Sequence, residues 1–128
     1  MKLMVEVAPG ELIDKITILE IKLLNIEDET KLANVRHEHE VLMETFRETI
    51  EETADLRALM DELREANKSI WDIEDEIRAL ERAQDFGDRF VAVARSVYRS
   101  NDLRAATKRK INELLDSALI EEKSYAPY

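Results

Sequence analysis

Apolar residues recur at spacings of three and four along most of the chain, which is the pattern of amphipathic helices. The pattern predicts four helices, over residues 11–25, about 29–52, about 54–84 and about 88–118. The first is apolar nearly all round, which is typical of a helix that is central or buried on two sides. The last two are about twice as long as the first, roughly 45 Å against 22 Å. We therefore expect the long pair to extend beyond the short one.

The connections between these helices are short, which favours antiparallel neighbours. Asp28 and Thr53 are suited to cap the second and third helices, and the segment 85–88 holds the only glycine between helices. The sequence predicts an all-α fold, an antiparallel bundle of four main helices in one domain over residues 1–128. Residues 1–8 alternate as a short N-terminal strand or arm would, and residues 119–128 form a polar C-terminal tail.

Polar residues run beside the apolar line of the third predicted helix. That line passes through Leu63, Ala66, Ile70, Ile73 and Ile77, and a second line lies to one side of it at the same spacing. The side line consists of Asn67, Trp71, Glu74 and Arg78. We expect these side chains at the boundary of the core, with Glu74 and Arg78 as an i,i+4 pair.

The last predicted helix carries polar residues on its core line itself. If it runs unbroken, Asn101, Arg104 and Lys108 occupy three consecutive turns of that line. Buried Arg and Lys are rare unless they are paired or bind a ligand. One alternative is a break at 100–101 that resets the phase, with Asn101 as an N-cap. Another is that both long side chains lie along the bundle edge with their charges in water.

A continuous helix predicts a polar cluster between the helices. Glu20 lies on an apolar face of the first helix, where a carboxylate needs a basic partner to remain ionised. We therefore expect Glu20 among the residues that pair with Arg104 and Lys108. The predicted polar cluster consists of Glu20, Asn67, Trp71, Glu74, Arg78, Asn101, Arg104 and Lys108.

Charge narrows the classes of partner. The net charge is −10, yet residues 89–110 hold seven basic groups against Asp102 alone. An acidic chain is a poor match to nucleic acid, so we expect none. The basic stripe, which includes Arg95 and Arg99, is better explained as the complement of an acidic helix within the chain or in a second subunit. It could also bind a small anion.

The remaining composition argues against several kinds of chemistry. There is no cysteine, no apolar run of membrane-spanning length and no signal-peptide pattern, so we expect a soluble cytoplasmic protein with no membrane contact. His39 lies on the core line of the second helix, where a hydrogen-bonded core histidine is commoner than a metal ligand. Pairs of carboxylates at metal-binding spacing, such as Glu48 with Glu51, arise from the acidic composition alone. We therefore expect no metal and no cofactor.

We also expect a homodimer, because a second copy would cover the overhanging ends of the long helices.

Several segments together resemble a small bacterial family of unknown function. The resemblance is carried by residues 9–16 with 19–22, 32–36, 67–78, 85–87, 94–104, 108–109 with 111–115, and 121–125. The Asn-x-x-Ile-Trp-x-x-Glu-Asp segment that begins at Asn67 also faintly resembles a second uncharacterised helical family. Members of both tend to accompany glycosyltransferases of surface-polysaccharide synthesis. The resemblance implies that the protein works in the context of surface-polysaccharide synthesis, but it does not imply a particular reaction.

Three functions are compatible with the sequence. The first is a binding or assembly module linked to cell-envelope polysaccharide synthesis, with polysaccharide-synthesis proteins as partners and a polar cluster closed by internal ion pairs. The second is a small-anion site or enzyme, for a phosphosugar, nucleotide sugar or carboxylate. It would hold the anion with Arg78, Arg104 and Lys108 and use Glu20 or Glu74 as acid or base, in the manner of helical chorismate mutases. The third is a magnesium-dependent nucleotide pyrophosphohydrolase. Whether the chain is an enzyme stays open.

Overall fold

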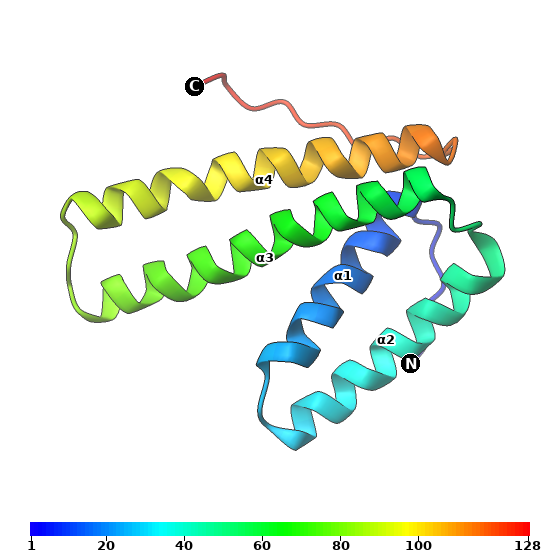
Figure 1. The fold of residues 1–128 in the computed structure, drawn as a ribbon, viewed down its shortest axis with the longest axis horizontal. Coiled ribbons are helices and arrows are strands. Elements are labelled where there is room, and N and C mark those ends of the chain that lie inside the picture. The colour runs from blue at the N-terminus through cyan, green and yellow to red at the C-terminus, as the bar shows by residue number, and fades with distance from the viewer.

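The computed structural model describes residues 1–128 and contains four helices (Figure 1). These are α1 (Pro9–Asn25), α2 (Glu29–Thr49), α3 (Ala54–Arg82) and α4 (Asp88–Leu114). The prediction of an all-α chain with four helices, two of them long, is confirmed. Helix α4 ends at Leu114, before the predicted end near residue 118. Asp116 follows with φ of 52°, a left-handed conformation that does not continue a right-handed helix.

The helix ends follow from capping residues in the sequence. Oδ1 of Asp28 accepts a hydrogen bond from the backbone N–H of Lys31 at 2.9 Å. Oγ1 of Thr53 likewise accepts one from the N–H of Leu56 at 3.2 Å. Each cap satisfies a donor that has no partner inside the helix. Both predicted caps are therefore confirmed, and the loop before α4 reverses the chain as expected.

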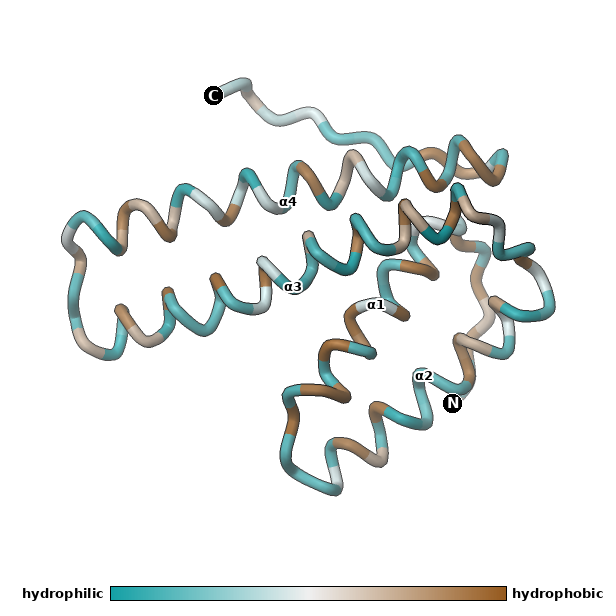
Figure 2. The backbone as a smooth tube through the Cα atoms, in the orientation of Figure 1, coloured by the Kyte–Doolittle hydropathy of each residue, from teal (hydrophilic) through white to brown (hydrophobic).

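The four helices form two antiparallel hairpins, α1–α2 and α3–α4. Figure 1 shows the α1–α2 hairpin crossing one half of the longer α3–α4 hairpin. Helix α1 packs against all three other helices, whereas α2 packs against α1 alone. Figure 2 shows why: hydrophobic residues are dense along α1 and sparser on the other helices. The prediction that the first helix is central is confirmed.

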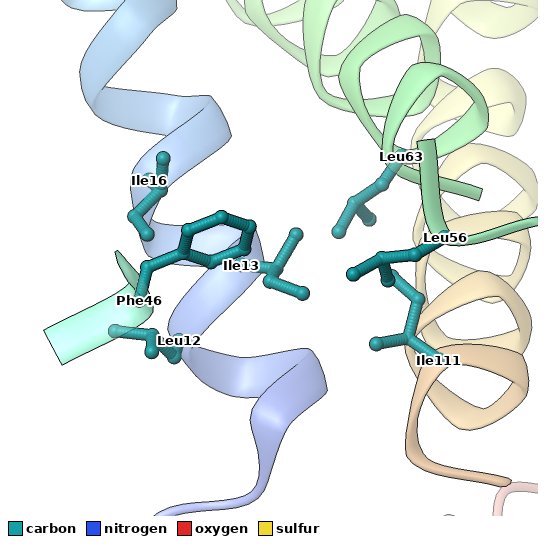
Figure 3. Packing of buried hydrophobic residues seen from close by; sticks show 7 residues of the cluster. All are labelled: Leu12, Ile13, Ile16, Phe46, Leu56, Leu63 and Ile111. Carbon is teal, nitrogen blue, oxygen red and sulfur yellow. The ribbon is translucent and has the colours of Figure 1, made fainter. Parts of the chain in front are cut away.

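The buried core lies where α1 meets the other three helices. Ile13 is fully buried and lies between Phe46 of α2 on one side and Leu56 and Ile111 on the other (Figure 3). The cluster consists of Leu12, Ile13, Ile16, Phe46, Leu56, Leu63 and Ile111. Burying an aliphatic side chain of this size contributes about 1.5–3 kcal/mol, so α1 provides much of what holds the two hairpins together.

The expected N-terminal strand is not present. Residues 1–8 precede α1 without regular structure, and residues 1–7 are exposed. A single alternating segment forms a strand only when a second strand accepts its hydrogen bonds, and this structure has none. The alternative prediction, an N-terminal arm, describes what is found.

The long hairpin extends beyond α1, as the helix lengths predict. We call this part the overhang, residues 70–82 of α3 and 88–101 of α4. No residue of α3 beyond Asn67 is buried, and within the overhang Val93 alone is buried. The remaining apolar side chains there are only half-buried or exposed, because two helices alone cannot enclose an apolar stripe that three helices enclose elsewhere.

Candidate functional site

Helix α4 is continuous through residues 100 and 101, so the phase of its core line is unbroken. The alternative with a helix break and Asn101 as an N-cap is therefore wrong. Lys108 is buried, and the side chain of Arg104 is only 31% exposed. Both cations lie on the side of α4 that faces α1, where the unbroken pattern places them.

A network of four polar residues joins α1, α3 and α4. We call it the Asp14 network: Asp14, Thr17, Asn67 and Arg104. The Asp14 carboxylate accepts hydrogen bonds from Nε and Nη2 of Arg104, the first at 2.9 Å, and from Nδ2 of Asn67 at 2.9 Å. Nδ2 of Asn67 also donates to Oγ1 of Thr17 at 2.9 Å. Thr17 in turn donates to the backbone carbonyl of Asp14 at 2.8 Å.

The network keeps a buried charge ionised. Burial raises the pKa of Asp14, but the hydrogen bonds from Arg104 and Asn67 and the charges of Arg104 and Lys108 outweigh it. The pKa of Asp14 therefore lies below its ordinary value. The hydrogen bond with Asp14 also raises the pKa of Arg104. A carboxylate that is 1% exposed is tolerated here because its charge is matched and its oxygens have partners.

A second group of charges lies one turn further along α4. We call it the Lys108 bridge: Glu11, Lys108 and Glu121. Nζ of Lys108 lies 2.8 Å from Oε2 of Glu11 and 2.9 Å from Oε2 of Glu121. Burial lowers the pKa of Lys108, but the hydrogen bonds to the two carboxylates outweigh burial and hold the pKa above its ordinary value. Glu11 belongs to α1, and Glu121 belongs to the C-terminal tail.

The first turn of α1 also contacts α4 through the backbone of Gly10. The backbone N–H of Gly10 donates to Oδ1 of Asn112 at 2.7 Å. A Cβ built on Gly10 would lie 2.6 Å from the backbone oxygen of Lys108 and 2.8 Å from that same Oδ1. The absence of a side chain at Gly10 is therefore what lets α1 approach α4 closely enough to form both polar groups.

The structure divides the predicted polar cluster. Asn67 and Arg104 meet in the Asp14 network, and Lys108 lies beside them. Asn101, half-buried one turn before Arg104, lines a cavity with both cations.

The other members of the predicted cluster lie apart from the network. Glu20 pairs with Arg64 at 3.4 Å. Glu74 pairs with Arg78 at 3.2 Å as an i,i+4 pair, and Arg78 is exposed. Trp71 is half-buried on the overhang.

The basic stripe is partly used within the chain. Arg104 and Lys108 pair with α1, Arg109 with Glu113 and Glu122, and Lys110 with Glu62 at 3.8 Å. Arg89 pairs with Glu76 of α3. Arg95 and Arg99 are exposed and make no ion pair within the chain.

The sequence pattern did not identify Asp14, Thr17 and Glu11, the partners on α1. The sequence of the first helix does contain a signal for these partners. Because α1 is apolar nearly all round, most of its positions are enclosed by neighbours, and Asp14 and Thr17 lie one turn apart on one buried side of it. The periodicity favours Glu20 instead, because Glu20 lies in line with Ile13 and Ile16.

The third candidate function needs side chains that bind a metal ion. The structure gathers no three histidine or acidic side chains that could hold a metal ion. The expectation of a hydrogen-bonded His39 is wrong, because its Nε2 is buried without a hydrogen-bond partner.

None of the four helices combines the length and the apolar character needed to span a membrane.

The arrangement has two chemically different parts. The Asp14 network is closed, since each of its charges has a partner in the chain, and it acts as a structural lock between three helices. The Lys108 bridge borders a cavity of about 150 Å³ lined by Asn101, Arg104, Ala105, Lys108, Glu121 and Lys123. A ligand in this cavity would meet the Lys108 bridge and the outer side of Arg104, whereas the Asp14 carboxylate is 1% exposed and out of its reach.

Comparisons with known proteins give one match. The model of a family described as a family of unknown function (DUF6165) matches residues 1–128. The match confirms the resemblance to a family of unknown function over the whole chain. The search of curated proteins found no match, and the search of solved structures found none.

Proposed function

We propose that the chain, which belongs to this family of unknown function, is a binding and assembly module that pairs with a second copy through its overhang. The proposal rests on the burial of the apolar line of α3, which we call the α3 stripe. The stripe is buried beside α1 at Leu63 and Ala66. It is only half-buried in the overhang, at Ile70, Ile73 and Ile77. A long apolar stripe that its own chain covers only in part is a common feature of interaction surfaces.

The charges of the overhang favour a second copy as the occupant. Helix α4 presents Arg95 and Arg99, and α3 presents Asp75 and Glu81, and none of the four makes an ion pair within the chain. A twofold axis brings the same patch of two subunits together. In the antiparallel pair that we propose, the partner subunit supplies charges opposite to those left unpaired on each helix. The overhang thus combines a half-covered apolar stripe with unpaired charges of both signs.

Light scattering should give twice the chain mass of 14.9 kDa at micromolar concentration. The double variant Arg95→Glu with Arg99→Glu should give a single chain mass, because like charges then face each other across the interface. Both side chains are exposed, so the monomer should keep its helical circular dichroism. The control, Arg36→Glu with Arg47→Glu, makes the same charge change on α2 and should stay dimeric. A wild-type protein that is monomeric at all concentrations, or a dimer insensitive to the α4 reversal, would refute the proposal.

The cellular context is the second part of the proposal. The resemblance to families that accompany glycosyltransferases supports a place in cell-envelope polysaccharide synthesis, with polysaccharide-synthesis proteins as further partners. A strain that lacks the chain should make altered surface polysaccharide, restored by the wild type and not by the α4 double variant. Unchanged polysaccharide in the deletion strain would rule this context out while leaving the dimer proposal intact.

A further inference from the structure

The C-terminal tail, residues 119–128, lies along α4 without regular structure (Figure 1). All its residues are exposed. Glu122 pairs with Arg109 at 3.3 Å, and the ring of Tyr128 lies 4.8 Å from that of Tyr98. Exposed ion pairs and ring contacts of this kind contribute little each. The tail is therefore held in place by contacts that a competitor can replace.

Glu121 is the one tail residue that reaches a buried partner. Its carboxylate lies 2.9 Å from Nζ of Lys108, whose side chain is 8% exposed, while the Glu121 side chain itself is 50% exposed. Lys108 keeps a second carboxylate, Glu11, on the rigid helix α1. Lys108 thus remains paired if Glu121 turns into solvent.

The cavity beneath the tail has a charge balance that depends on Glu121. Arg104, Lys108 and Lys123 line it, and Asp14 and Glu11 neutralise the first two from behind. With Glu121 in place, three cations meet three carboxylates. Without it, one positive charge is left over in a cavity of about 150 Å³.

Hydrogen-bond donors also remain for a ligand in this cavity. A guanidinium has five N–H donors, and Asp14 takes those of Nε and Nη2 of Arg104 described above. An ammonium group has three, and the two carboxylates take two from Lys108. The amide of Asn101 and the ammonium of Lys123 border the same space.

We propose that this cavity is a binding site for one small oxyanion, a carboxylate or a phosphate group, and that Glu121 fills it when the ligand is absent. The ligand takes over the hydrogen bond from Lys108, and the tail carboxylate moves into water. A neighbouring cavity of about 520 Å³ shares Glu121 and Lys123 and is lined by polar side chains that include Asn112 and Asp116. Movement of Glu121 therefore joins the anion site to room for the rest of a larger polar ligand.

Calorimetric titration with inorganic phosphate, at ionic strength held constant with chloride, tests the site. Glu121→Gln should lower the Kd for phosphate about tenfold, because it removes the internal competitor and leaves the cations. Lys123→Met should raise the Kd, and this exposed residue can be changed without disturbing the core. Repeating the titration with acetate distinguishes a general oxyanion site from one for phosphate alone.

Glu122→Gln is the matched control, since it removes the same charge one residue away and does not line the 150 Å³ cavity. Its Kd for phosphate should stay within about twofold of the wild type. Equal improvement in Glu121→Gln and Glu122→Gln would reduce the effect to general electrostatics and overturn the proposal. Absence of saturable binding of either anion to Glu121→Gln would overturn it as well.

Discussion

Replacing Arg104 with Met should lower the free energy of unfolding by about 3–5 kcal/mol. Met keeps much of the stem volume and removes the charge, so the Asp14 carboxylate, 1% exposed, keeps only the hydrogen bond from Asn67. A buried carboxylate without its cation is among the costliest single defects in a folded chain. The measurement is the denaturant midpoint and slope at pH 7, with the variant and the wild type at equal protein concentrations.

Two further variants identify the source of this loss. Arg36→Met removes an arginine whose partner, Glu29, lies 3.7 Å away with both side chains exposed, and it should cost less than about 1 kcal/mol. Combining Arg104→Met with Asp14→Leu should recover at least half of the loss, because no unpaired charge is then left inside. A loss of equal size at Arg36, or no recovery in the double variant, would show that the pair is not the reason.

The pH dependence of the same variant has a definite sign. In the wild type the pKa of Asp14 is lowered by folding, so its contribution to stability is present above the unfolded pKa and is lost as pH falls through the folded pKa. Without Arg104, we expect burial to outweigh the remaining hydrogen bond from Asn67 and the charge of Lys108, and thus to place the pKa of Asp14 above its ordinary value. Protonation then favours the folded state, so the deficit of Arg104→Met should begin to shrink as pH falls through this raised pKa, above the ordinary value of about 4, and should shrink further below it.

Replacing Gly10 with Ala should cost about 2 kcal/mol, within the range of 1–3 kcal/mol typical of overpacking. The added Cβ meets the backbone oxygen of Lys108 at 2.6 Å, and a helix backbone cannot turn aside as a flexible side chain can. Helix α1 must move away, which lengthens the hydrogen bond from Gly10 to Asn112 and strains the Lys108 bridge. Thermal unfolding monitored by circular dichroism provides the measurement.

The chain provides its own control for the glycine substitution. The nearest atom to a Cβ on Gly87 is Oδ1 of Asp85 at 3.4 Å, an ordinary contact. Its φ of −78° suits any L residue. Gly87→Ala should therefore leave stability unchanged or slightly raise it through the unfolded chain. If Gly10→Ala behaves like Gly87→Ala, the close approach of α1 and α4 does not limit stability.

The sequence predicts the fold well because helix periodicity is local. The unbroken phase from Val93 to Ile111 places Arg104 and Lys108 toward the interior, and the structure has them there. Their partners could not be read in the same way, since which residue of α1 faces Arg104 depends on how two helices far apart in the chain cross. Glu20 and Asp14 are equally plausible on periodicity, and the close contact at Gly10 favours the one near the start of α1.

The same limit explains the N-terminal segment. The alternation of apolar and polar residues in 1–8 meets the local requirement for a strand. A strand also needs a second strand to pair with, and no local pattern shows whether one is present. Glu121 is similar, because a polar tail has no periodicity by which its position can be inferred. Features that depend on one helix were thus predictable, and features that depend on contacts across the chain were not.

The span of the Asp14 network along the chain governs the order in which the molecule assembles. Asp14 and Arg104 are 90 residues apart, and Gly10 and Asn112 are 102 apart. The α3–α4 hairpin closes across a short loop, whereas these contacts require the largest loss of chain entropy. We therefore expect the hairpin to nucleate folding and α1 to dock after the transition state. Loss of Arg104 should then accelerate unfolding and leave the folding rate nearly unchanged, so that the network acts mainly on the lifetime of the native state.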